Sequence, residues 1–150
     1  MQSELGSSLS RDSRLSPSLI AAYRETEYRV MANRPFVLRI DEPCAELLAL
    51  YETSQLACAT FITAYNPFSQ AVSHAQNTER QADLAKELRR RRLTLLEGIG
   101  EHPTGDWPGE PSYLALGLSL EAAKSLGQRY EQNAIVWCGA DGVPQLVLLK

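Results

Sequence analysis

Small polar side chains gather at the end of a largely apolar run, residues 57–64. Thr63, Asn66 and Ser69 gather where this stretch ends. Hydroxyl and amide groups both donate and accept hydrogen bonds, so such a cluster can read a polar ligand. Polar groups beside a core lower stability unless they are paired, and a binding site is one reason to keep them there. We therefore expect these three residues to bind a ligand, with a local Asx-type turn at Asn66 as the alternative.

The next segment, residues 73–91, has the period of a helix and carries polar groups on its apolar side. At about 100° per residue, Asn77 falls in the middle of the arc that the leucines define, and Arg80 lies beside it. The guanidinium group of Arg80 suits a carboxylate or a phosphate. Alternatively, Ser73 caps the helix while Asn77 and Arg80 reach solvent at its exposed end.

Glu110 is the candidate catalytic residue. It stands just before a predicted strand, at the end of a proline-rich loop over residues 101–111 that also contains Trp107. A carboxylate shielded by such neighbours has a raised pKa and can act as a general acid or base. A solvated loop glutamate is the alternative.

Gln132 and Asn133 form a fourth polar group, between a predicted helix and a predicted strand. Their amides can read a polar ligand, so we include both among the candidate ligand-binding residues. The alternative is that they only end the helix, because asparagine tolerates the left-handed conformation found there.

The elements that must position these residues alternate between helix and strand. Strands are predicted over residues 25–31, 36–40, 57–65, 93–99, 112–118, 134–138 and 145–149. Helices are predicted after Ser16, after Asp41, over 73–91 and over 119–130. We expect an α/β or α+β fold, a single-domain mixed β-sheet covered by helices over residues 16–150, with a disordered tail over residues 1–15.

Composition narrows the class of protein. The chain has 150 residues, 44% of them hydrophobic, and a net charge of −3, as in a soluble single domain without a general attraction to nucleic acid or membranes. No apolar run is long enough for a membrane span, and no secretory leader is expected. Three cysteines without close spacing indicate reduced thiols in the cytoplasm. Neither a metal site nor a particular cofactor is predicted, and the oligomeric state stays open.

A run of four basic residues raises the alternative of nucleic-acid binding: Arg89, Arg90, Arg91 and Arg92. The run ends the predicted helix, where cations interact favourably with the helix dipole. Acidic residues precede it on the same helix. A solvated helix end is therefore our interpretation, and nucleic acid is not the expected partner.

Several ordered motifs resemble a known family. They are FITAYNPFS at residues 61–69 with Asn77 and Arg80, GDW and EPSYL within 105–114, and GQRYEQNAIV at 127–136. This pattern resembles the bacterial DUF3293 family over about residues 58–149. The family is a domain of unknown function, so the resemblance implies no particular reaction or cofactor. It does imply a bacterial cytoplasmic protein.

Together these observations favour a small-molecule site, with Glu110 as the acid or base and Arg80 holding an anionic metabolite that carries a phosphate or a carboxylate. A hydrolase or transferase would use such a site. One alternative is a non-catalytic binding or regulatory module that acts through a protein partner. The other is nucleic-acid binding through the four arginines.

Overall fold

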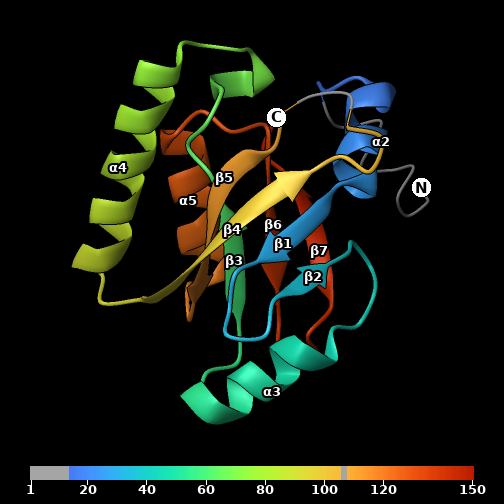
Figure 1. Cartoon of the computed structure of the whole chain (residues 1–150), viewed down its shortest axis with the longest axis vertical. Helices are drawn as coiled ribbons and strands as arrows, with labels where there is room; N and C mark the ends of the chain where they lie inside the picture. The colour runs from blue at the N-terminus through green and yellow to red at the C-terminus, as the bar shows by residue number, and fades with distance from the viewer. Residues whose placement is uncertain (1–13, 106–107) are drawn as a thin grey trace.

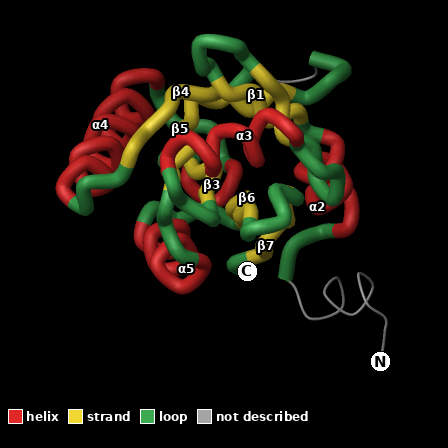
Figure 2. The backbone as a smooth tube through the Cα atoms, turned by 90° about the horizontal axis from the view of Figure 1, so that it is seen from below, coloured by secondary structure: helices red, strands yellow, loops and turns green. Residues whose placement is uncertain are grey.

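A seven-stranded antiparallel sheet, curled around its inner face, forms the frame of the protein (Figures 1 and 2). The computed structural model describes residues 14–105 and 108–150. The strand order is β2-β1-β4-β5-β3-β6-β7. Their bounds are β1 Glu27–Val30, β2 Phe36–Leu38, β3 Ala59–Ile62, β4 Thr94–Glu101, β5 Glu110–Leu116, β6 Ala134–Cys138 and β7 Pro144–Leu148.

In the described residues, four α-helices and one short 3-10 helix pack around the sheet. They are α2 Pro17–Glu25, α3 Ala45–Ser54, η1 Pro67–Ser69, α4 His74–Arg90 and α5 Leu120–Arg129. Serine begins three of the α-helices, because the hydroxyls of Ser16, Ser73 and Ser119 accept hydrogen bonds from backbone N–H groups of the first turn. At Ser73 a reciprocal bond from the Gln76 side chain completes a capping box. Ser73 is therefore a helix cap.

Strand β3 lies at the centre of the structure, and all of its residues are buried. Ala59 and Phe61 belong to the core inside the curl, whereas Ile62 belongs to the core under the helices. Alternate side chains of a strand point to opposite faces, so both faces of β3 must be covered. The prediction of a central strand covered on both sides is confirmed, although the strand ends at Ile62 rather than near residue 65.

Two hydrophobic cores hold the layers together. Inside the curl, α3 packs its Leu47 and Tyr51 against the inner face of the sheet. On the outer face, α4 and α5 contribute side chains such as Leu88 and Leu126 (Figure 1). Burying a leucine side chain contributes about 1.5–3 kcal/mol, so these two cores fix the positions of the strands between them.

The single-domain prediction is confirmed, and the antiparallel strand pairs identify the fold as α+β. Two local details differ from expectation. Helix α3 begins only at Ala45, because Cys44 before it is extended; further back, Asp41 takes a left-handed conformation with φ 67°. In the β6–β7 turn, Gly142 has positive φ and Asp141 does not. The expected tail falls mainly on residues 1–13, which lie outside the described part.

Two glycines of β4 offer a test of packing inside the curl. A Cβ atom on Gly98 would lie 2.6 Å from the Arg29 carbonyl oxygen and 2.7 Å from Phe61. A Cβ atom on Gly100 would meet its nearest neighbour, Thr26, at 3.7 Å. We expect Gly98→Ala to lower the free energy of unfolding by about 1–3 kcal/mol through overpacking. Gly100→Ala is the matched control and should stay within about 1 kcal/mol of wild type by urea denaturation. Equal effects would contradict this packing.

Candidate functional site

A cavity of about 610 Å³ lies inside the curl, between helix α2 and the inner face of the sheet. We call it the inner cavity. Seven of the eight predicted site residues line it: Thr63, Asn66, Ser69, Asn77, Glu110, Gln132 and Asn133. The eighth, Arg80, is not among the described lining residues. Segments far apart in the sequence thus meet at one end of the curled sheet.

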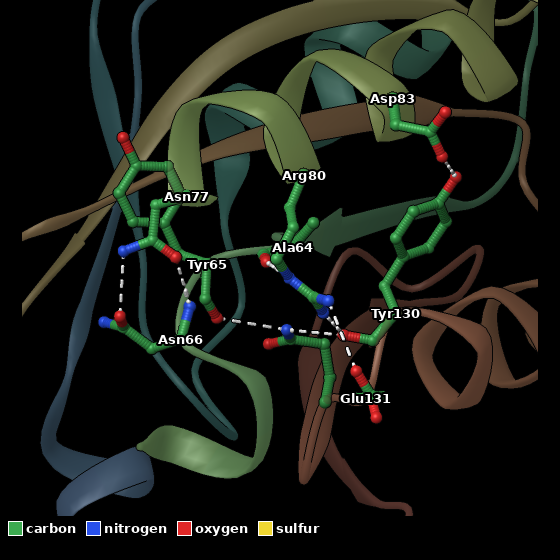
Figure 3. A network of polar contacts seen from close by, with 9 residues as sticks. Ala64, Tyr65, Asn66, Asn77, Arg80, Asp83, Tyr130 and Glu131 are labelled. Carbon is green, nitrogen blue, oxygen red and sulfur yellow. Dashed lines mark hydrogen bonds and ion pairs between the residues drawn. The ribbon is translucent and has the colours of Figure 1, made fainter. Parts of the chain in front are cut away.

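Asn66 and Asn77 form a reciprocal pair of hydrogen bonds (Figure 3). The Asn66 backbone N–H donates to Asn77 Oδ1 at 2.8 Å, and Asn77 Nδ2 donates to Asn66 Oδ1 at 2.9 Å. Asn77 is buried on α4, where its amide would be unfavourable without partners. The pair therefore satisfies Asn77 and ties the first turns of α4 to the chain that leaves β3.

The backbone that carries Asn66 is unusual. Asn66, Phe68 and Ser69 have φ angles of 47°, 53° and 60°, all in the left-handed region. Asparagine accepts this conformation more readily than most residues, whereas at other non-glycine residues it costs about 1–2 kcal/mol. A residue before proline favours an extended or a turn conformation, and Asn66 lies in a turn rather than in extended backbone. Because the chain turns here, Thr63, Tyr65 and Asn66 all line the inner cavity instead of alternating between two faces.

Gln81, one turn after Asn77 on α4, joins the same network but was missed by the sequence analysis. Its Oε1 accepts from the Ala64 backbone N–H at 2.9 Å, and its Nε2 donates to the Pro111 carbonyl at 3.1 Å. Thr63 donates to the same Pro111 carbonyl at 2.7 Å. Gln81 and Thr63 thus bridge the ends of β3 and β5. The four-residue spacing from Asn77 was the available signal.

Arg80 is engaged by the protein itself (Figure 3). Its Nε donates to the Ala64 carbonyl at 2.8 Å, a terminal nitrogen donates to the Tyr130 carbonyl, and the other pairs with Glu131 at 3.2 Å. These bonds link α4 to the end of β3 and to the segment after α5. The Arg80 guanidinium therefore stabilises the fold beside the inner cavity by joining these segments.

Glu110 begins β5, on the same side of the strand as Ser112, instead of lying in the preceding loop. One carboxylate oxygen accepts from Asn66 Nδ2 at 2.9 Å. The other accepts no hydrogen bond from any described residue. Burial raises the pKa of Glu110, and the hydrogen bond from Asn66 only partly opposes this. The expected shielding by Trp107 falls on a residue outside the described part.

Gln132 and Asn133 are both buried at the inner cavity. Gln132 Nε2 donates to the carbonyls of Tyr65 and Tyr130, at 3.1 and 3.2 Å. Asn133 Nδ2 donates to Tyr23 Oη at 3.1 Å and to Ser69 Oγ at 3.2 Å. Neither residue supplies the left-handed conformation after α5, which falls on Glu131 with φ 59°. Their side chains hold segments together at the site.

With this geometry established, the chain can be compared with known proteins. Residues 62–135 match the model of a family described as "Protein of unknown function (DUF3293)". This part of the chain belongs to the DUF3293 family. The matched DUF3293 region contains all eight predicted site residues, and the family description assigns no activity to them. No curated protein and no solved structure matches the chain.

Helix α2 lies outside the DUF3293 region yet completes the inner cavity, which the sequence did not indicate. The Tyr23 hydroxyl forms a short hydrogen bond with Ser69 and accepts one from Asn133. His102, from the loop after β4, also lines the cavity, and its Nε2 pairs with Glu25 of α2 at 3.1 Å. These contacts join residues 46 to 110 positions apart, and no local pattern predicts such pairings.

The basic run ends α4 within the DUF3293 region. Arg90 and Arg91 pair with Glu87 at 2.6 and 3.1 Å, and Arg129 approaches the same carboxylate at 3.5 Å. The hydrogen bond from Arg90 helps to hold the pKa of Glu87 below its ordinary value. One carboxylate therefore offsets part of this positive charge within the protein. Nucleic-acid binding by the run stays an untested alternative.

Replacing Arg80 tests its part in the frame. We expect Arg80→Met to lower the free energy of unfolding by at least about 2 kcal/mol, because the Ala64 and Tyr130 carbonyls lose a charged donor. Arg89→Met is the matched control on the exposed side of the same helix and should change it by no more than about 0.5 kcal/mol. Guanidinium denaturation of both variants measures the difference. Similar free energies of unfolding for the two variants would show that the Arg80 bonds do not stabilise the fold.

The raised pKa of Glu110 predicts a pH dependence of stability. The folded protein keeps a proton that the unfolded chain releases above about pH 4.5, so this carboxyl makes stability fall as pH rises from there to the raised pKa. Glu110→Gln removes the titration and retains an acceptor for Asn66. The stability of this variant relative to wild type should therefore increase between about pH 4 and about pH 7. Denaturation at both pH values, with exposed Glu79→Gln as control, measures it. If the stability of Glu110→Gln relative to wild type stays constant or decreases with pH, the pKa of Glu110 is not raised.

Proposed function

We propose that the inner cavity binds a small polar molecule and that Glu110 is its main recognition group. One observation carries this proposal. Polar side chains from separate segments converge on a cavity that contains a carboxylate oxygen without a donor among the described residues. A volume of about 610 Å³ also falls within the range of about 300–1,000 Å³ typical of small-molecule sites.

The charge of the lining changes the expected ligand. An anionic metabolite was predicted because Arg80 lay near the other polar groups, but its guanidinium is bonded to the frame. No lysine or arginine occurs among the described residues that line the inner cavity. The described lining does include His74 and His102, but no side chain with a permanent positive charge. An anion would therefore face the Glu110 carboxylate without a permanent cation to offset it, which is unfavourable in a partly enclosed site. We accordingly propose a neutral or positively charged ligand.

Glu110 is also the acid–base candidate if the bound molecule reacts. Burial raises the pKa of Glu110, so its carboxyl holds a proton to higher pH than an ordinary glutamate and can exchange that proton with a bound molecule, as hydrolysis and group transfer require. Non-catalytic binding is the second candidate function. It is favoured because the only side chain among the described residues that bonds to the Glu110 carboxylate is the amide of Asn66, not a nucleophile or a second acid.

For the setting of this function we propose the bacterial cytoplasm. The family resemblance supports this, as do three free cysteines, of which Cys44 and Cys138 are buried. Separately, none of the helices in residues 14–105 and 108–150 is long and apolar enough to cross a bilayer.

A blocked cavity tests the proposed function. Ala71 is exposed and lines the inner cavity, so Ala71→Trp should obstruct it without disturbing a core. Ala82→Trp, at an exposed position of α4 outside the lining, is the matched control. We expect a panel of polar metabolites, screened by thermal unfolding, to yield a compound that stabilises wild type and the control. At about 100 times its Kd, such a compound would add about 2.7 kcal/mol.

The same compound should stabilise Ala71→Trp much less. Two results would overturn the proposal: a panel in which nothing stabilises the wild-type protein, or a ligand that stabilises Ala71→Trp as strongly as wild type.

A further inference from the structure

Three acceptor oxygens at the inner cavity have no donor among the described residues. They belong to Glu110, Gln132 and Asn133, whose other side-chain polar atoms bond to the protein. The two amides are more than nine-tenths buried, at 8% and 5% exposure. Buried acceptors without partners are unfavourable, and a ligand that supplies hydrogen-bond donors would satisfy them.

The orientation of the Gln132 amide follows from its neighbours. Its nitrogen lies within hydrogen-bond distance of two backbone carbonyls, those of Tyr65 and Tyr130. A carbonyl can only accept, so turning the amide over would set oxygen against oxygen at both places. The Gln132 side-chain oxygen is thereby left as an acceptor for another partner.

Charge and aromatic groups favour a cation. The carboxylate of Glu110 has no charged partner among the described residues, and a cationic ligand would offset the unfavourable burial of its charge. Tyr23, Tyr28, Phe61 and Tyr65 also line the inner cavity. Aromatic faces attract cations, and more strongly where water is excluded.

We propose that the inner cavity takes a small organic cation whose ammonium group donates to Glu110 and whose remaining donors reach the oxygens of Gln132 and Asn133. An ammonium group has three donors and no acceptor, which complements a lining of acceptors. This inference rests on the proposed function and specifies its ligand class. Binding of the cation makes and breaks no covalent bond.

Calorimetric titration with matched probes tests the ligand class. Putrescine, butanediol and succinate have the same number of carbon atoms and differ in charge, and agmatine and spermidine extend the cationic series. We expect at least one cation to bind more tightly than butanediol and succinate. Its affinity should fall at least about tenfold in Glu110→Gln, a loss of about 1.4 kcal/mol, because the variant keeps the shape but lacks the charge. Exposed Glu79→Gln should bind as wild type does.

A second variant tests the inference even if Glu110→Gln does not fold. Asn133→Asp adds a negative charge at the cavity with little change in size, so it should tighten cation binding at least about threefold. Cation binding that neither variant alters would be adventitious attraction to the acidic surface and would overturn the inference.

The probes also separate the two proposals. If butanediol or succinate binds best, and Ala71→Trp abolishes that binding, the cationic ligand class is wrong while the small-molecule site stands. If neither these probes nor the metabolite panel bind the wild-type protein, both proposals fail.

Discussion

The paired hydrogen bonds between Asn66 and Asn77 determine how the chain passes from the central strand to its longest helix. They join Asn66, which is left-handed, to Asn77, which is buried and whose amide would be unfavourable there without partners. Asparagine meets both needs, since it tolerates the left-handed region and carries a donor and an acceptor. The following residues, also left-handed at Phe68 and Ser69, can then turn beneath α2.

The cavity chemistry follows from this constraint. The Asn66 amide uses its oxygen for Asn77 and its nitrogen for Glu110, so one side chain links the frame to the carboxylate. Arg80 and Gln81 of α4 hold the same end of β3, because both bond to the backbone of Ala64. With these groups committed to the frame, the free acceptors of the cavity are left for a ligand. The proposed preference for a donor-rich cation is the consequence.

Local patterns predicted much of this architecture. Serine caps located three of the four described α-helices, the apolar run at residues 57–64 located the central strand, and helical spacing placed Asn77 inward. The sequence could not show that Arg80 would bond to carbonyls of two distant segments. Nor could it place Tyr23, whose partners depend on how the sheet curls. Tertiary packing decides such contacts, and it also overrode the extended bias at Asn66.

The central claim is that Glu110 is a partly buried carboxyl with a raised pKa, held in the inner cavity by Asn66. A carbon-detected NMR titration of its side-chain carboxyl, in wild type and in Asn66→Ala, tests this most directly. The account predicts an apparent pKa above the ordinary 4.5 in wild type, because burial disfavours the charged form. It predicts a still higher value in Asn66→Ala, because the amide donor that stabilises the carboxylate is gone. A midpoint at or below 4.5 in wild type, or no change on removing Asn66, would contradict it.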